Sequence, residues 1–202
     1  MKIRVMLTLT ALTLALSTVA FAQNSKLSLN PSGFGAHSYV AWKAQQGLPD
    51  SNGNGNHALY FQKDTTTGTF AAGVAVVKGV GGLNASQLTG LSWEHRDDGH
   101  CGAGAPRWNV NTESANGTPH TYFIGCAAMA HTPGSAPGWT RDTAALPIFA
   151  SDETITSLVI VFDEGNDTPG VTPFSFIFLD NITVELNGMP KVFTGPMDNS
   201  NK

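Results

Sequence analysis

The chain has 202 residues, of which 41% are hydrophobic and 13% charged, and it carries 22 Gly. Charged residues make up about 25% of an average globular protein, and a coiled coil or a long helical bundle needs more still, so both are excluded. Apolar runs along most of the chain argue against disorder. The net charge of −4, with scattered basic residues, offers no electrostatic footprint for nucleic acid.

The first 22 residues have the features of a secretory signal peptide. Lys2 and Arg4 precede a long apolar run, which ends in Ala20-Phe21-Ala22 before Gln23. The alternative is a membrane anchor, but the run is barely long enough to span a bilayer. We therefore expect a secreted chain, extracellular or periplasmic, with no membrane contact after cleavage. The loss of two basic residues and no acid would change the net charge from −4 to −6.

Short runs of β-branched and aromatic residues, separated by Gly, Pro and Asn, predict strands along the rest of the chain. The predicted strands are 58–62, 69–78, 88–95, 107–112, 121–126, 155–162 and 174–186. The dipeptide Asn116-Gly117 predicts a hairpin between the fourth and fifth of these. The segment 23–57 is polar with an aromatic cluster, residues 127–150 are irregular, and a loose tail is expected from about residue 189.

No amphipathic helix and no internal repeat are visible. Residues 23–202 are thus predicted to form one all-β domain, a two-sheet antiparallel β-sandwich of the jelly-roll type with one disulfide. The disulfide is expected between Cys101 and Cys126, because an even pair of cysteines in an exported chain is typical of a bond. The alternative is a pair of free thiols.

The longest predicted strand contains an unusual carboxylate. Phe174, Phe176 and Phe178 share one parity with Ile182, Val184 and Leu186, so this face is predicted to point into the core. Asp180 has the same parity, and an ionised carboxylate in a core is costly unless it is paired or bound to a metal. Three outcomes are open for Asp180: a bulge that turns it to solvent, a structural pairing with N–H groups or Arg, or a hard cation such as calcium.

The residues Thr154–Phe162 and Phe178-Leu179-Asp180-Asn181-Ile182-Thr183-Val184 resemble the closing strands of galactose-binding-like jelly rolls and of carbohydrate-binding modules. The resemblance covers about the last 35 residues. It implies carbohydrate as the partner and, at Asp180 alone, a structural calcium ion. A second calcium hypothesis is the loop Asp50-Ser51-Asn52-Gly53-Asn54-Gly55, but Phe61 stands where that pattern needs an acid, which favours a plain turn.

The loop before Cys101 gathers charged side chains. Asp97, Asp98, His100 and Arg107 are the predicted ligand-binding residues, since a disulfide-tied loop on a rigid scaffold is a common place for a binding site. A metal site of His95, Asp98 and His100 is a further possibility, and a solvated loop is the plain alternative. Trp108 shares parity with Val110 and is expected in the core.

No catalytic motif such as Gly-x-Ser-x-Gly or His-Glu-x-x-His is present. We therefore expect an exported, non-catalytic protein that binds carbohydrate. The alternatives are a structural or adhesive cell-surface protein and a polysaccharide hydrolase or lyase. An exposed row of Trp and Tyr would favour binding, a broad apolar patch would favour adhesion, and two convergent acids in a groove would favour catalysis. The oligomeric state has no sequence signal.

Overall fold

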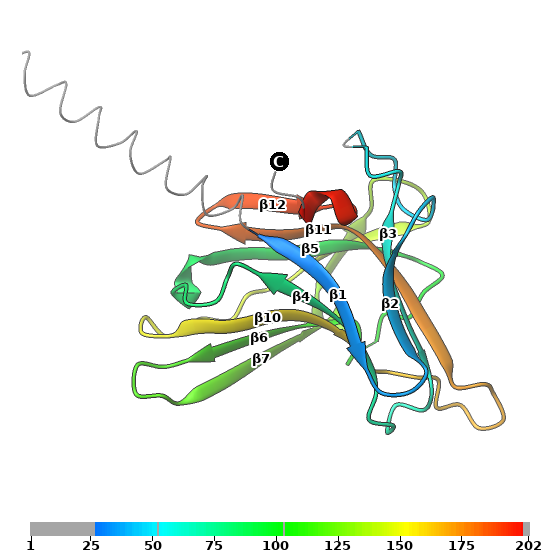
Figure 1. Ribbon diagram of the computed structural model, residues 1–202, viewed down its shortest axis with the longest axis horizontal. Coiled ribbons are helices and arrows are strands. Elements are labelled where there is room, and N and C mark those ends of the chain that lie inside the picture. Colours follow the sequence, from blue (N-terminus) through cyan, green and yellow to red (C-terminus); the bar gives the residue numbers. More distant parts are fainter. Residues whose placement is uncertain (1–26, 52, 103, 200–202) are drawn as a thin grey trace, which may run out of the picture.

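The computed structural model describes residues 27–51, 53–102 and 104–199, and these form two antiparallel β-sheets in two layers (Figure 1). The expected signal peptide, residues 1–22, lies outside the described residues. In the described part, the helices are three short 3₁₀ turns, and none could cross a membrane. The prediction of a β-sandwich of the jelly-roll type is confirmed.

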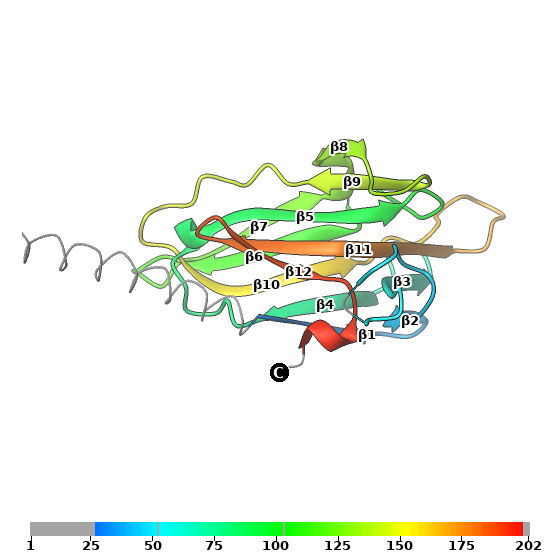
Figure 2. The ribbon, with the colours of Figure 1, turned by 90° about the horizontal axis from the view of Figure 1, so that it is seen from above.

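The first sheet has five strands in the order β1-β4-β10-β6-β7, and the second has seven, in the order β2-β3-β11-β5-β9-β8 with β12 paired to β11. Seen from above (Figure 2), β11 runs beside β5, and β9 and β8 follow beyond β5. The bounds are β1 Ser28–Phe34, β2 Ser38–Lys43, β3 Ala58–Asp64, β4 Ala72–Lys78, β5 Leu88–Arg96, β6 Arg107–Glu113, β7 Pro119–Gly125, β8 Ala130–Pro133, β9 Trp139–Thr143, β10 Thr154–Phe162, β11 Phe174–Leu186 and β12 Met189–Phe193.

Apolar side chains from both sheets fill the space between the layers. Trp93 of β5 stacks on Trp108 of β6, with ring centroids 5.3 Å apart, and both are fully buried. The prediction that Trp108 is a core residue is confirmed. Each large ring removed from water adds a few kcal/mol to stability, so this pair anchors one sheet on the other.

The hairpin between β6 and β7 forms where the Asn-Gly dipeptide predicted it. Gly117 has a φ of 83° and donates its N–H to the Ser114 carbonyl. The Asn116 side chain accepts the N–H of Thr118, which closes the turn. Asn-Gly suits this turn because glycine adopts a positive φ without steric cost.

The predicted orientation of the first half of β11 is wrong. Ile177 and Leu179 face the core, so Phe174, Phe176 and Phe178 lie on the outer face of the seven-stranded sheet. The register with β5 shifts between Asp180 and Thr183, and Asn181 adopts a φ of 46°. This β-bulge inserts a residue, which reverses the parity, so that Ile182, Val184 and Leu186 face inward after it.

Three segments contain strands that the sequence did not indicate. The polar segment before residue 58 contributes β1 and β2, and residues 127–150 contribute β8 and β9. The tail expected to be loose from about residue 189 forms β12, which pairs with Ile182–Leu186 of β11. Phe193 at its end is fully buried, and this apolar contact holds the tail on the sheet.

Candidate functional site

An aromatic groove lies on the outer face of the seven-stranded sheet, with a volume of about 580 Å³. Four strands supply it, because alternate residues of β2, β3 and β11 point away from the core and β5 ends beside them. Its lining residues, which define the groove from here on, are Tyr39, Lys43, Ala44, Gln46, Tyr60, Gln62, Arg96, Phe174, Phe176 and Phe178.

Five rings follow one another along this groove. The successive centroid distances are 5.6 Å from Phe174 to Phe176, 6.0 Å from Phe176 to Phe178, 4.7 Å from Phe178 to Tyr60 and 6.2 Å from Tyr60 to Tyr39. The end rings are the most open, with Tyr39 44% exposed and Phe174 39% exposed. Rings in such contact support one another's rotamers, so the surface is formed before any ligand arrives.

Polar and cationic groups border the rings. The Tyr60 hydroxyl donates to Gln62 Oε1 at 2.9 Å, and burial, followed by the nearby Tyr39, raises the pKa of Tyr60. The Arg96 guanidinium lies 3.8 Å from the centroid of the Phe178 ring, and Lys43 Nζ lies 4.8 Å from that of Tyr39. The groove thus combines apolar ring faces with side chains that can hydrogen-bond.

A second depression, the polar hollow, adjoins the groove and shares Phe174 and Phe176 with it. Its volume is about 650 Å³, and its lining residues are Thr67, Asp98, Gly99, His100, Glu164, Gly165, Asn166, Asp167, Phe174, Ser175 and Phe176. Three of these carry carboxylates and one carries an imidazole. His100 Nε2 lies 2.6 Å from Glu164 Oε2, and Asp98 pairs with Arg96 at 2.7 Å.

The structure brings together only some of the predicted ligand-binding residues. Asp98 and His100 both line the polar hollow. Asp97 instead accepts a hydrogen bond from Thr140, and Arg107 forms a bidentate ion pair with Asp163. The four residues therefore do not form one site, although each stays a candidate for ligand contact.

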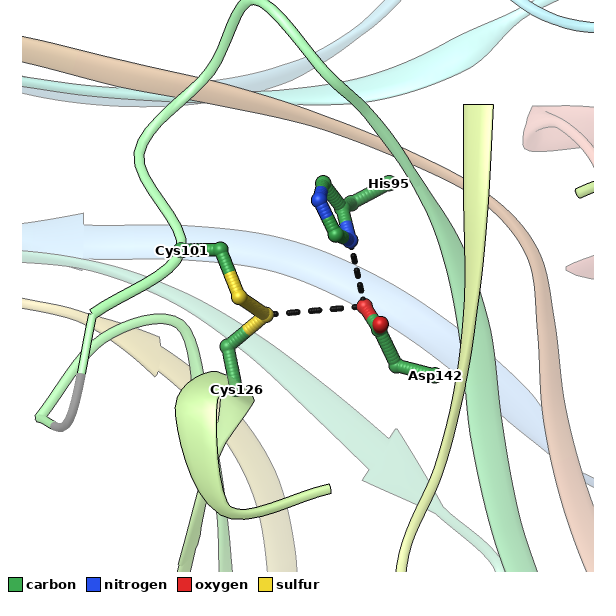
Figure 3. Close-up of side chains that lie close together, drawn as sticks. All are labelled: His95, Cys101, Cys126 and Asp142. Atoms are coloured by element: carbon green, nitrogen blue, oxygen red, sulfur yellow. Dashed lines mark hydrogen bonds and ion pairs between the residues drawn. A yellow bond between two sulfur atoms is a disulfide. The ribbon is translucent and has the colours of Figure 1, made fainter. Parts of the chain in front are cut away.

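The alternative metal site of His95, Asp98 and His100 is not assembled, because each has a different partner. His95 belongs to a cluster around Asp142 (Figure 3). The Asp142 side chain is fully buried, and its Oδ2 lies 2.6 Å from Trp93 Nε1 and 2.6 Å from His95 Nδ1. The Sγ of Cys126 lies 3.5 Å from the same oxygen. The Trp93 indole N–H and the His95 imidazole thus satisfy this buried carboxylate, whereas the Cys126 sulfur, which belongs to the disulfide and carries no hydrogen, only contacts it.

The Cys101–Cys126 disulfide is present, with an S–S distance of 2.05 Å, and no free cysteine occurs in the described chain. It ties the loop after β5 to the end of β7 beside Asp142 (Figure 3). The prediction of this bond is confirmed.

Asp180 is only 1% exposed although it lies at the bulge. Its Oδ2 accepts the N–H of Leu48 at 2.7 Å, and its Oδ1 accepts the N–H of Asn181 at 2.6 Å. Burial raises the pKa of Asp180 from 3.8 to about 7, against the lowering effect of these two hydrogen bonds. The structural pairing with N–H groups is therefore present, and the bulge does not turn Asp180 to solvent.

Calcium at Asp180 stays a prediction. Among the described residues, one cluster brings three or more potential metal-ligating side chains together. It consists of His95, Cys101, Cys126 and Asp142 and does not include Asp180. The carboxylate of Asp180 instead fixes the loop between β2 and β3 through Leu48. The backbone at position 47 lies so close to Asp180 that only glycine fits there. A Cβ would meet the His57 carbonyl oxygen at 2.2 Å and Asp180 Oδ2 at 2.5 Å.

The Asp50 loop has the hydrogen bonds of a plain turn. Asp50 Oδ1 accepts the N–H of Asn54 at 3.2 Å, and Oδ2 accepts that of Asn56 at 2.8 Å. The Asn54 side chain in turn donates to Thr194 and Asp198, near the C-terminal end of the described chain. The loop thereby links β3 to the segment after β12.

Sequence reasoning missed the groove. Its rings come from β2, β3 and β11, and three of the five are phenylalanines that the parity of β11 assigned to the core. The available signal was Asn181, one of the non-glycine residues that most readily adopt a positive φ. Its position directly after Asp180 indicates where a bulge can form, after which the side chains that point into the core switch from odd-numbered to even-numbered residues.

Comparison with known proteins gives no match to a family model and none to a curated protein. Solved structures of carbohydrate-binding modules are similar to this chain, in agreement with the resemblance seen in its closing strands.

Two of these structures are a family 11 carbohydrate-binding module of the cellulosomal cellulase Lic26A-Cel5E of Clostridium thermocellum and a family 11 module of the same organism in complex with a β-1,3-1,4-mixed-linked tetrasaccharide. The first has 15% identity and a TM-score of 0.44 over 79% of this chain and 89% of its own. The second has 15% identity and a TM-score of 0.42 over 78% and 88%.

A third is the C-terminal family 22 module of Clostridium thermocellum Xyn10B, with 14% identity and a TM-score of 0.38 over 81% of this chain and 88% of its own. With TM-scores below 0.5, these structures do not decide what the present chain binds.

Proposed function

We propose that this protein binds carbohydrate without transforming it, through the aromatic groove. The observation that carries the proposal is the row of five contacting rings on an outer sheet face, bordered by Gln46, Gln62, Lys43 and Arg96. Sugar rings present C–H faces that pack on aromatic rings and hydroxyls that need hydrogen-bond partners, and this surface offers both.

The exposure of the end rings supports this use. Burying an aromatic ring stabilises a protein, whereas leaving the ring in contact with water does not. A contiguous row of partly exposed rings is therefore typical of an interaction surface. The row contains tyrosines and phenylalanines and no tryptophan. It nevertheless meets the expectation for binding better than that for adhesion, because polar side chains interrupt the apolar area.

The test is titration calorimetry of residues 23–202 against a panel of soluble plant and microbial polysaccharides. The variant Tyr39→Ala/Phe174→Ala removes the two most exposed rings of the row. We expect it to weaken binding about tenfold or more, at about three- to tenfold for each ring. The matched control is Phe123→Ala, which removes a 66% exposed ring from β7 of the other sheet. Equal affinity of the double variant and the parent would overturn the proposal.

A second candidate function, hydrolysis of a glycan, is favoured by one feature of the polar hollow. Asp98 and Glu164 both line it, and it adjoins the groove. Glycoside hydrolysis uses two carboxyl groups on opposite sides of the bond. Release of reducing ends from a bound polysaccharide by the parent, and its loss in Glu164→Gln, would establish this function in place of simple binding.

Export is proposed on the N-terminal signal. We expect the exported chain to begin at Gln23, which mass spectrometry of its N-terminal peptide would show. An N-terminus that retains residues 1–22 would contradict this.

A further inference from the structure

We propose that the groove selects anionic glycans, whose carboxylate or sulfate group pairs with Lys43. This inference rests on the proposed carbohydrate binding and names the class of sugar. It starts from the state of Lys43, the last residue of the edge strand β2. Its ammonium lies over the Tyr39 and Tyr60 rings, 4.8 Å and 5.7 Å from their centroids.

Lys43 differs from most other cations of the described residues. Arg96, Arg107 and Arg141 each pair with a carboxylate. Lys63 and Lys191 donate to backbone carbonyls. In the described part of the chain, Lys43 and Lys78 have neither kind of partner, and of these two only Lys43 lines the groove, whereas Lys78 is exposed at the end of β4.

Positive and negative side chains are separated around Lys43, with the cations in the groove and the carboxylates in the polar hollow. The residues that line the groove include two cations, Lys43 and Arg96, and no carboxylate. The neighbouring polar hollow contains three carboxylates, those of Asp98, Glu164 and Asp167. The chain as a whole is acidic, with a net charge of −4. A positive groove in an acidic protein attracts an anionic ligand to this one place.

The geometry also orients such a ligand. Arg96 is held by Asp98 and by Gln46, so its charge is partly compensated. Lys43, at the sheet edge, has no carboxylate partner among the described residues. A sugar ring on Tyr60 and Phe178 would place a ring substituent toward Lys43. The polar hollow, which adjoins the groove at Phe174 and Phe176, would accept neutral hydroxyls, and its carboxylates would repel a second anionic group.

A neutral glycan gains little from this arrangement. Hydroxyl groups are bound equally well by amides such as Gln46 and Gln62, which the groove already supplies. An ammonium that stays unpaired in a groove is desolvated by a neutral ligand without compensation, which lowers its affinity. Lys43 therefore discriminates between glycans by charge.

The experiment compares each polysaccharide with its own neutral form. The probes are glucuronoxylan and carboxyl-reduced glucuronoxylan for the carboxylate, and carrageenan and desulfated carrageenan for the sulfate ester. Titration calorimetry gives the ratio of affinities for the charged and the neutral form. We expect a ratio of about ten in the parent for at least one pair. We also expect this ratio to fall as the salt concentration rises from about 20 mM to about 500 mM.

The variants are Lys43→Gln and, as the matched control, Lys78→Gln, which removes the same charge from an exposed position on β4 of the other sheet. Lys43→Gln should bring the ratio to about one, Lys43→Arg should preserve most of it, and Lys78→Gln should leave it unchanged. The inference is overturned if the parent binds both members of each pair equally, or if the two Gln variants lower the ratio equally.

Failure of the underlying proposal gives a different result. If the Tyr39→Ala/Phe174→Ala variant binds every probe as the parent does, the glycan site is elsewhere, and both statements fall. If that variant loses binding while the ratio in the parent is one, the groove binds sugars and only the charge selection is refuted.

Discussion

Asp180 should make the stability of this protein depend on pH in a way that one substitution removes. Burial raises its pKa from 3.8 to about 7 in the folded state. At pH values between about 3.8 and about 7, Asp180 holds a proton in the folded chain that it lacks in the unfolded chain. The stability that Asp180 contributes is therefore fully present below about pH 3.8 and is lost as the pH rises to about 7.

The size of the effect follows from the same pKa. One pKa unit corresponds to about 1.4 kcal/mol, so the full loss is about 4 kcal/mol, of which about 3 kcal/mol falls between pH 5 and pH 8. Asn at position 180 cannot ionise. The free energy of unfolding of the parent, relative to that of Asp180→Asn, should thus be about 3 kcal/mol higher at pH 5 than at pH 8.

The assay is urea unfolding followed by tryptophan fluorescence at the two pH values. The control is Asp64→Asn, which removes an exposed carboxylate at the end of β3. The reasoning is refuted if the difference between the parent and Asp180→Asn is the same at pH 5 and pH 8. Asp180→Ala should also destabilise the fold at pH 5, by about 1–3 kcal/mol, because the Leu48 N–H loses its acceptor.

Calcium at Asp180 would reverse this pH dependence, since a bound cation keeps the carboxylate ionised. EDTA would then lower the melting temperature of the parent at pH 8 and leave Asp180→Asn unaffected. A parent that does not respond to EDTA or to added calcium has only backbone partners at Asp180.

Three further outcomes are expected. Replacing Cys101 and Cys126 by Ser should lower the free energy of unfolding by about 3 kcal/mol, measured in urea, and intact-mass analysis of the parent after alkylation should find no reactive thiol. Asp142→Ala should cost about 3 kcal/mol in the same assay, because a buried indole N–H and an imidazole lose their acceptor; a loss below about 0.5 kcal/mol would contradict this. Asp98→Ala and His100→Ala should weaken glycan binding, measured by calorimetry, with little change in melting temperature. If both bind as the parent does, the polar hollow is not part of the site.

Local sequence determined most of the strands and one turn. Runs such as Ile155–Phe162 form strands because β-branched and aromatic side chains fit a pleated, half-buried surface. Asn116-Gly117 closes a hairpin because the glycine accepts a positive φ. The Cys101–Cys126 bond could also be predicted, since only one pairing exists.

The tertiary structure alone decided the candidate site. Alternation assigns a face only while the register is unbroken, and the bulge at Asp180 and Asn181 breaks it in the middle of β11. As a result, three phenylalanines expected in the core line the groove instead.

The groove itself joins strands that are far apart in the sequence, because β11 pairs with β3 and β5, and β2 pairs with β3. No local pattern records that Tyr39 and Phe174 lie in one row. Strand pairing across the sheet, which depends on the packing of the whole core, places them there.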